Sequence, residues 1–249
     1  MLWFSYHMSM NLTYEEHTVK SKNIVKRWLH RQRFAASFRL LQLEPGQRFL
    51  DYGCGDGELS LQISHVFPGI EIVAFDPATD LYQQAKRKLA NQNNILVSKD
   101  FSNVVGTFDR IACLETVEHL PPPELLRVFK NIHSVLEPEG FCLFTFPIEH
   151  GLAALPKNSY RIAAKRDKYA TIDRAMRSAL GLAISREPQE RLSDCNYIYS
   201  HVGFDCRKMI NQIAEYFSIT DIKVLPLGTI TLGLGNSVAV IVKRKIENQ

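Results

Sequence analysis

A glycine-rich segment from Arg48 to Gly57 contains the residues of this chain best suited to bind a nucleotide-like ligand. Its glycines, Gly53, Gly55 and Gly57, permit a tight turn and let the backbone approach a ligand where a Cβ would clash. Apolar residues before the turn predict a strand, and residues 57–67 predict a helix. The N-terminus of such a helix has unpaired N–H groups that can bind a ligand.

Acidic residues in the same turn favour a cationic cofactor over a dinucleotide. The dinucleotide fingerprint is GxGxxG, but Glu58 stands where its third glycine would be. A pyrophosphate would be repelled by Asp51, Asp56 and Glu58, whereas the ammonium and sulfonium groups of S-adenosylmethionine would be attracted. The charges therefore favour S-adenosylmethionine over NAD.

Two further carboxylates follow the next two predicted strands. Asp76 ends one strand and precedes Pro77, and Asp100 ends the next and precedes Phe101. Open α/β sheets bind ligands at the carboxyl ends of their parallel strands. We therefore expect Asp76 to accept hydrogen bonds from ribose hydroxyls and Asp100 to accept one from an adenine amino group, with Phe101 packed on the ring.

Predicted strands and helices alternate over the middle of the chain, which indicates parallel βαβ units with right-handed crossovers. The predicted strands cover residues 48–53, 71–76, 94–100, 108–114 and 139–146, and the helices between them cover 57–67, 77–90 and 121–136. A later helix over 205–217 is followed by two closing strands, 219–225 and 237–243, with a loop or hairpin at 228–235.

Two regions lie outside this pattern. Residues 14–43 predict one or two helices within an N-terminal extension, 1–44, whose basic residues form a solvated face or a lid over a ligand. The main domain then covers 45–249, with 150–202 as an inserted helical cap rich in lysine and arginine. The basic residues of the cap are compatible with a solvated face, with recognition of an anionic acceptor, or with contact to a membrane surface.

Composition excludes several classes of protein. The 249 residues are 45% hydrophobic and 22% charged, and the net charge of +4 is too small to indicate nucleic-acid binding. Five cysteines without a CxxC pair predict a reduced, cytoplasmic protein. No apolar run reaches the roughly 18 residues of a membrane span, and the N-terminus lacks the pattern of a signal peptide.

Five motifs resemble, in order and spacing, those of class I S-adenosylmethionine-dependent methyltransferases. They are Leu50–Gly57, Ala74–Pro77, Lys99–Phe101, Cys113–Pro121 and Leu136–Leu143. The resemblance covers roughly residues 45–147 and, more weakly, 203–243. It implies an α/β fold with a Rossmann-like seven-stranded mixed sheet of order 3-2-1-4-5-7-6, the last strand antiparallel, and helices on both faces.

The resemblance also implies which residues bind S-adenosyl-L-methionine. Asp51 and Gly53 would line the methionine end, Asp76 the ribose, and Asp100 the adenine. The full set carried over is Asp51, Gly53, Cys54, Gly55, Gly57, Asp76, Pro77, Asp100, Phe101, Leu114 and Glu115. The implied reaction is an in-line displacement of the sulfonium methyl by an acceptor atom, so the cofactor carries the difficult chemistry and the protein supplies alignment.

A hydroxyl acceptor would need a base, and His119, His150, His201 and Glu149 are the candidates. Each of them also suits a purely structural role. Glu115, Glu118 and His119 raise the question of a metal, but no second ligand cluster of known spacing accompanies them, so we expect none. Oligomeric state stays open.

The expected acceptor is a small molecule or biosynthetic intermediate that can be anionic, and a hydroxyl on a sugar-containing or lipid-linked precursor is the first choice. The glutamate-histidine pair after the fourth strand also resembles quinone-pathway enzymes, so a quinone or isoprenoid-type ring is the alternative. Two other classes remain open at this point. They are a nicotinamide-dependent oxidoreductase and a catalytically silent module that binds S-adenosylmethionine.

Overall fold

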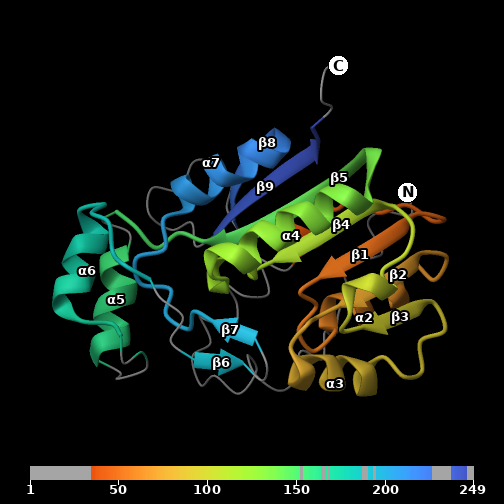
Figure 1. Ribbon diagram of the computed structural model, residues 1–249, viewed down its shortest axis with the longest axis horizontal. Coiled ribbons are helices and arrows are strands. Elements are labelled where there is room, and N and C mark those ends of the chain that lie inside the picture. Colours follow the sequence, from red (N-terminus) through yellow and green to blue (C-terminus); the bar gives the residue numbers. More distant parts are fainter. Residues whose placement is uncertain are drawn as a thin grey trace, which may run out of the picture.

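The computed structural model describes residues 35–151, 154–163, 167, 169–186, 190–192, 195–225 and 237–245. Its centre is one seven-stranded sheet (Figure 1). The strands of this sheet are β1 (Arg48–Tyr52), β2 (Glu71–Phe75), β3 (Ile95–Ser98), β4 (Phe108–Leu114), β5 (Leu136–Pro147), β8 (Phe217–Leu225) and β9 (Ser237–Arg244).

The strand order is β3-β2-β1-β4-β5-β9-β8. Strands β1 to β5 run parallel, and β9 is antiparallel to both of its neighbours, β5 and β8. Counted within this sheet, β8 is the sixth strand and β9 the seventh, so the predicted order 3-2-1-4-5-7-6 is confirmed. The order reverses between β1 and β4, which opens a crevice at their carboxyl ends.

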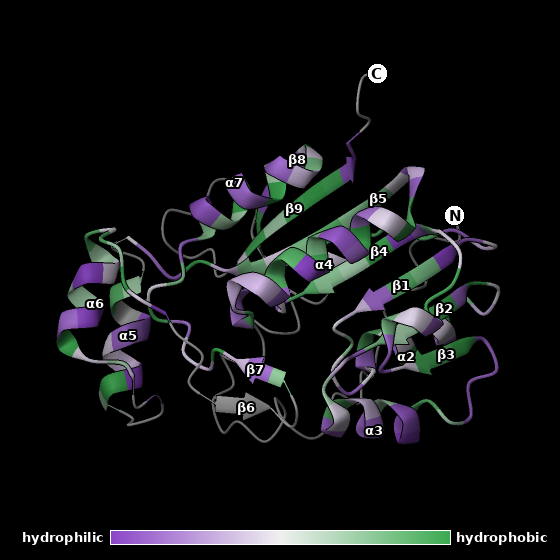
Figure 2. Cartoon of the chain, in the orientation of Figure 1, coloured by the Kyte–Doolittle hydropathy of each residue, from purple (hydrophilic) through white to green (hydrophobic). Residues whose placement is uncertain are grey.

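Helices cover both faces of the sheet, so most residues of its central strands are apolar, although β1 also carries hydrophilic residues (Figure 2). One face packs against α4 (Pro122–Val135) and α7 (Cys206–Tyr216), through residues such as Phe129 and Ile213. The other face packs against α2 (Glu58–Val66) and the segment 35–43, through residues such as Ile63 and Leu41. Helix α3 (Thr79–Lys88) connects β2 to β3.

The segment after β5 contains two helices and a hairpin. Helices α5 (Ala154–Ala163) and α6 (Ile172–Ala179) lie together beyond the carboxyl ends of β4 and β5 (Figure 1). Strands β6 (Glu190–Leu192) and β7 (Cys195–Tyr197) form an antiparallel pair that the sequence did not predict. The reason is their length, because three residues are too few to show a strand periodicity.

The N-terminal extension is described only in part. Residues 35–40 are helical, and Leu41 and Leu43 are buried in the core on the α2 face. The helix predicted for residues 14–34 and the loop predicted at 228–235 lie outside the described residues. None of the described helices has the length and apolar character needed to cross a membrane.

Candidate cofactor and acceptor site

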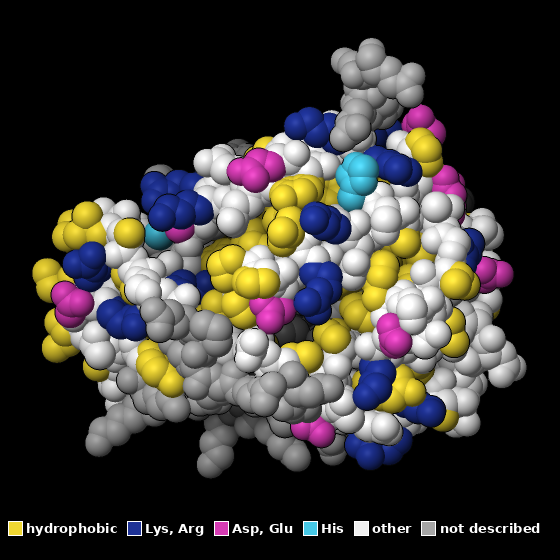
Figure 3. All heavy atoms as spheres, viewed as in Figure 1, with side chains coloured by type: hydrophobic (Ala, Val, Ile, Leu, Met, Phe, Trp, Pro, Cys, Tyr) yellow, Lys and Arg dark blue, Asp and Glu magenta, His cyan; other side chains and the backbone are white. Residues whose placement is uncertain are grey.

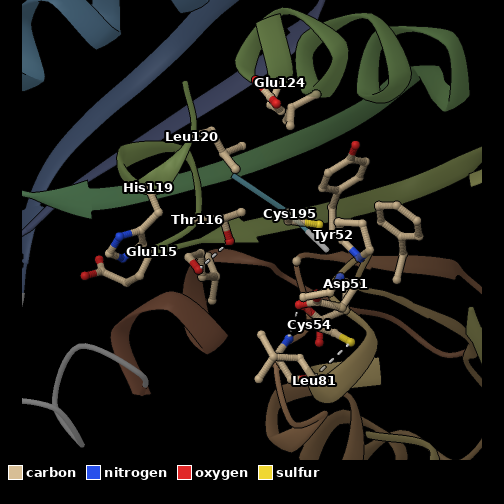
Figure 4. A pocket seen from close by; sticks show the side chains of 18 of the residues that line it. Asp51, Tyr52, Cys54, Leu81, Glu115, Thr116, His119, Leu120, Glu124 and Cys195 are labelled. Atoms are coloured by element: carbon tan, nitrogen blue, oxygen red, sulfur yellow. Dashed lines mark hydrogen bonds between the residues drawn. The ribbon is translucent and has the colours of Figure 1, made fainter. Parts of the chain in front are cut away.

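A pocket of about 740 Å³ lies at the carboxyl ends of β1, β2 and β4 (Figure 4). Its wall is completed by Leu120 before α4, by Glu124 on α4 and by Cys195 on β7. Ten of the eleven residues predicted to bind the cofactor line it. They are Asp51, Gly53, Cys54, Gly55, Asp76, Pro77, Asp100, Phe101, Leu114 and Glu115.

The eleventh residue, Gly57, has a different role from the predicted one. It adopts a left-handed conformation with φ of +82°, and a Cβ there would lie 2.8 Å from Cδ1 of Leu89. Its lack of a side chain therefore lets the turn pack against the end of α3. A Cβ added at Gly53 would clash in a similar way with Thr116, because it would lie 2.6 Å from the Thr116 Oγ1.

Asp51 is a buried carboxyl group at the end of β1. Ser60 on α2 donates a hydrogen bond to its Oδ2 at 2.7 Å. Burial raises the pKa of Asp51 to about 7, and the nearby charge of Asp76 adds to this while the Ser60 hydrogen bond opposes it. A carboxylate destabilised in this way gains from a cationic ligand, which the ammonium of the methionine end would supply.

Asp76, just after β2, is hydrogen-bonded to the backbone of the glycine turn. Its Oδ2 accepts a hydrogen bond from the Gly55 N–H and its Oδ1 one from the Ala78 N–H, each at 2.9 Å. Burial raises its pKa to about 6, against the effect of these two bonds. Each carboxylate oxygen has a second lone pair, so Asp76 can still accept from two ribose hydroxyls.

Lys88 changes the electrostatic argument made from the sequence. Its Nζ lies 2.5 Å from Asp56 Oδ2 and 2.9 Å from Glu58 Oε2. Both carboxylates line the pocket, and the single charge of this lysine, about thirty residues further along the chain, offsets part of their negative charge. The preference for a cationic ligand therefore rests mainly on Asp51 and Asp76.

The adenine end is an exposed carboxylate beside an aromatic cluster. Asp100 accepts a hydrogen bond from the Ser102 N–H at 2.9 Å, and this bond lowers the pKa of Asp100. The Phe101 ring lies 5.8 Å from the Tyr52 ring and 5.5 Å from the Phe75 ring. Phe101 is therefore held in place by aromatic residues at the ends of β1 and β2, a signal present in the sequence that we did not use.

At the end of β4 the chain turns sharply toward the acceptor side. Glu115 has φ of +50°, a conformation that a residue with a side chain rarely adopts. Thr145 on β5 holds it, because the Thr145 carbonyl accepts from the Glu115 N–H at 2.9 Å and the Thr145 hydroxyl donates to Glu115 Oε1 at 3.2 Å. The turn leads into a short 3-10 helix, Val117–His119.

His119 is the one of the three predicted histidines that lines the pocket in the described chain. Its Nδ1 lies 2.9 Å from the Ile198 carbonyl oxygen, which can only accept, so Nδ1 donates and Nε2 keeps its lone pair. Its own carbonyl accepts from the Ile198 N–H at 2.8 Å, and its ring stacks on Tyr197 at 4.5 Å. His119 thus anchors β7 over the pocket.

Burial lowers the pKa of His119 to about 4, so the ring is neutral at pH 7. A neutral imidazole can accept a hydrogen bond, but a group of this pKa is a weak general base. His119 is therefore better suited to orient a hydroxyl than to remove its proton completely.

The structure does not bring His150, His201 or Glu149 to the pocket wall. His201 packs edge-on against the His119 ring, 4.7 Å away. His150 lies beside α7, with its Nδ1 3.7 Å from Cys206 Sγ and 3.9 Å from Asp205 Oδ1. The chain after β5 turns under α5 and buries Glu149, whose oxygens bind Arg161 at 2.6 and 2.9 Å.

Potential metal ligands occur together beside His119. Ligand atoms of Glu118, His119 and His201 all lie within 4.8 Å of one another. The buried Arg186 donates to the Glu118 carbonyl at 2.9 Å, and its charge acts on the Glu118 carboxylate and lowers the pKa of His119. A dication would be repelled by this arginine, so we assign no metal to the group.

Several residues of the site were missed from the sequence. They either support predicted residues or come from segments with no motif, and include Ser60, Lys88, Thr116, Asn131, Thr145 and Cys195. Polar residues such as Ser60 look like ordinary helix residues. Only their position opposite Asp51 or Glu115 gives them a role.

The sheet order, the crevice between β1 and β4 and the buried carboxylates Asp51 and Asp76 together define a class I methyltransferase fold and site. Solved structures agree on the fold. Magnesium protoporphyrin IX methyltransferase from Synechocystis, with bound SAH, aligns at a TM-score of 0.54 and 17% identity over 94% of this chain and 91% of that one. The PH0226 protein from Pyrococcus horikoshii aligns at a TM-score of 0.58 and 17% identity, over 98% of this chain and 99% of that one.

Residues 27–180 match the family model described as a methyltransferase domain, which is more than half of the chain. The protein therefore belongs to the methyltransferase-domain family. The predicted cofactor, S-adenosyl-L-methionine, is confirmed at the level of this class, and the nicotinamide-dependent alternative is set aside.

Curated relatives match over shorter stretches. A ubiquinone biosynthesis O-methyltransferase of Xanthomonas campestris is 33% identical over 103 residues, 39% of this chain and 41% of that protein. A putative methyltransferase of Bacillus subtilis is 29% identical over the same shares. The cyclopropane-fatty-acyl-phospholipid synthase of Escherichia coli is 25% identical over 62% of this chain and 38% of the enzyme. The chain thus spans about two fifths of these relatives.

Proposed function

We propose that this protein transfers the methyl group of S-adenosylmethionine to a hydroxyl on an apolar ring or lipid-linked biosynthetic intermediate. The observation that carries the proposal is the continuity of the pocket. One cavity reaches from Asp76 and Asp100 to His119 and Tyr197, so an acceptor under the hairpin would lie beside the cofactor.

The lining of the acceptor end supports an apolar molecule. Leu120 and Val128 contribute apolar surface, and Tyr197 presents an aromatic ring that is stacked on His119. Flat rings pack favourably on such a surface. Relatives named for ubiquinone O-methylation and for phospholipid modification are compatible with an acceptor of this class.

A sugar-containing anionic acceptor is the second candidate, and the basic residues of the cap were its support. Two of these now have other partners. Arg161 binds both oxygens of Glu149, and Arg186 donates to the carbonyls of Glu118 and Ser200. Using either for an acceptor would break an internal interaction, so the apolar candidate is favoured.

The protein's part in the reaction is alignment and exclusion of water. The cofactor supplies an activated methyl on a positive sulfur. The hairpin covers the pocket, while Glu115 and Thr116 shape the wall between cofactor and acceptor ends (Figure 4). His119 Nε2 would accept a hydrogen bond from the acceptor hydroxyl and orient its oxygen for in-line attack. As the oxygen–methyl bond forms and the sulfur–methyl bond breaks, the hydroxyl becomes strongly acidic, and its proton would leave through His119 Nε2 to solvent.

Formation of S-adenosylhomocysteine over a panel of hydroxylated quinone precursors, lipid-linked phenols and sugar-containing intermediates tests the proposal. Turnover with an apolar hydroxylated ring supports it, and turnover restricted to sugar-containing anions replaces it with the second candidate. Tight cofactor binding without turnover on any acceptor would identify a silent binding module instead.

His119→Gln and His119→Ala test the assigned role of the histidine. Glutamine can still donate from its amide to Ile198 and accept through its oxygen, so it should retain more activity than alanine. We expect kcat to fall by about 10- to 100-fold for alanine while cofactor affinity stays within about twofold. Equal activity of both variants and the parent would remove His119 from the acceptor site.

A further inference from the structure

Helix α6 presents a ridge of apolar side chains on the outside of the molecule. Ile172, Met176 and Leu180 are 71%, 57% and 69% exposed, and Leu182 just beyond them is 51% exposed. Steps of four residues advance about 40° around a helix, so the first three form one line along it. We call these four side chains the α6 ridge. Helices of globular proteins usually place polar residues on the solvent side, so the ridge reverses the usual pattern.

The opposite face of α6 fixes the helix in this orientation. Ala175 and Ser178 are buried, and the Ser178 hydroxyl donates to the carbonyl of Glu149. The Gly151 N–H donates to the Ser178 carbonyl at 3.0 Å, and Thr171 caps the helix by accepting from the Arg174 N–H at 3.3 Å. The ridge is therefore held outward by packing and hydrogen bonds on the inner side.

One arginine of α6 borders the ridge. Arg177 lies about 60° around the helix from Leu180, and it donates to the neutral Ala183 carbonyl at 2.9 Å, so its charge is not cancelled. Arg174 lies on the inner side, beside the buried Ser178, and donates to the Ser185 carbonyl at 3.1 Å. Asp173, the acid of the first turn, also lies beside the ridge. Figure 3 shows apolar, basic and acidic side chains together at the end of the molecule formed by α5 and α6.

We propose that the α6 ridge docks this protein on the surface of an anionic lipid bilayer. A short helix with apolar side chains on one side and Arg177 beside them suits shallow insertion at the headgroup level, with the guanidinium group near lipid phosphates. Four side chains fall short of the roughly 800 Å² per partner that a stable protein interface buries. The docking surface lies at the same end of the sheet as the pocket (Figure 1).

Sedimentation with vesicles tests the proposal. The full chain should bind vesicles of mixed phosphatidylcholine and phosphatidylglycerol more tightly than phosphatidylcholine alone. The double variant Ile172→Asp with Met176→Asp should bind at least about tenfold more weakly. The matched control is Leu96→Asp with Val105→Asp, which introduces the same two negative charges. Leu96 lies on β3 and Val105 in the loop that follows, and they are 51% and 66% exposed. The control should bind like the parent.

A second pair of variants separates the charge from the apolar contact. Arg177→Gln should weaken binding to anionic vesicles only, whereas Arg87→Gln on α3 should not. Circular dichroism and calorimetric titration with S-adenosylmethionine check that every variant folds and keeps its cofactor site, so the result is independent of the proposed acceptor.

Absence of binding by the parent, or equal loss in ridge variant and control, would overturn the proposal. Light scattering tests whether the ridge instead forms a dimer of this chain. A dimer that the ridge variant abolishes, without vesicle binding by the parent, would make the ridge an interface between copies of this chain and would also overturn it.

Discussion

At the scale of single residues, the site is governed by two carboxyl groups that the fold buries without an internal cation. Asp51 receives a hydrogen bond from Ser60, and Asp76 receives two from backbone N–H groups. Burial still raises the pKa of Asp51 to about 7 and that of Asp76 to about 6. The free site is thus electrostatically incomplete, and a cationic cofactor with ribose hydroxyls completes it.

Asp76→Ala should weaken S-adenosylmethionine binding by about 1–3 kcal/mol, because the ribose hydroxyls and the Gly55 N–H would lose a charged acceptor. Isothermal titration calorimetry measures this directly. Asp80→Ala, on the first turn of α3, is the control and should bind normally. An unchanged affinity in Asp76→Ala would refute the ribose assignment.

Cofactor affinity should depend on pH through the same two groups. The cofactor favours their ionised forms, so binding releases protons and strengthens as pH rises through about 6 and 7. Below that range affinity should fall by up to roughly tenfold per pH unit for each group. Titrations in buffers of different ionisation enthalpy measure the proton release, and Asp51→Asn should flatten the profile. Proton uptake on binding would contradict this account.

The raised pKa values also determine the direction in which the free energy of unfolding of the cofactor-free protein changes with pH. Both carboxyls are proton-binding groups whose pKa exceeds the ordinary 3.8 in the folded state. The stabilisation that the two carboxyls contribute to the folded state is fully present below about pH 4, and it is lost as the pH rises through 6 and 7. Denaturant unfolding without cofactor should show this loss, and Asp51→Asn should reduce it.

At the scale of elements, the glycine turn is held by its neighbours as much as by its own conformation. The Gly53 and Cys54 N–H groups donate to the Phe75 carbonyl of β2, at 2.8 and 3.0 Å. Gly57 packs on Leu89 at the end of α3. Turn, β2 and α3 therefore form one unit, and a change in packing far from the ligand should disturb the site.

Gly57→Ala and Gly46→Ala separate packing from backbone strain. Both glycines have left-handed φ values, +82° and +84°, but an added Cβ meets Leu89 only at Gly57 and meets nothing within 4 Å at Gly46. We expect Gly46→Ala to lower the free energy of unfolding by about 1 kcal/mol and Gly57→Ala by about 2–4 kcal/mol. Urea denaturation compares them, and equal losses would mean that the Leu89 contact is unimportant.

At the scale of the whole molecule, the segment after β5 is joined to the main domain by a few specific contacts. Arg161 on α5 binds Glu149 at the end of β5, and Ile198 after the hairpin pairs with His119. These contacts place α5, α6 and the hairpin over the carboxyl ends of the strands. The pocket is therefore completed by residues more than seventy positions away from His119, such as Cys195 and Tyr197.

Arg161→Met should destabilise the protein by about 2–3 kcal/mol, because the buried Glu149 carboxylate would lose its bidentate partner and keep the more distant Lys157, whose Nζ lies 4.0 Å from Oε1. Adding Glu149→Gln removes the stranded charge and should restore part of this stability. Thermal unfolding monitors both variants. If the single variant were as stable as the parent but impaired in acceptor use, Arg161 would instead contact the acceptor, as the basic-cap hypothesis predicts.

The sequence predicted the sheet order through the resemblance of its motifs to those of class I methyltransferases, and it predicted the cofactor end of the pocket from its carboxylates. This was possible because parallel βαβ units bring consecutive strand ends together, so Asp51, Asp76 and Asp100 needed only their place after apolar strands to be assigned. Their spacing is local information. The ion pairs of Lys88 with Asp56 and Glu58 depend on contacts between distant residues, and they reduce the negative charge that the turn alone would present.

The tertiary structure alone decided the acceptor end. Nothing in the spacing of His119, His150 and His201 indicates which one reaches the pocket, because that depends on how the segment after β5 folds back. Burial of Glu149 under α5 and pairing of His119 with Ile198 are contacts between distant parts of the chain. Such contacts form wherever packing is best, and no local periodicity records them.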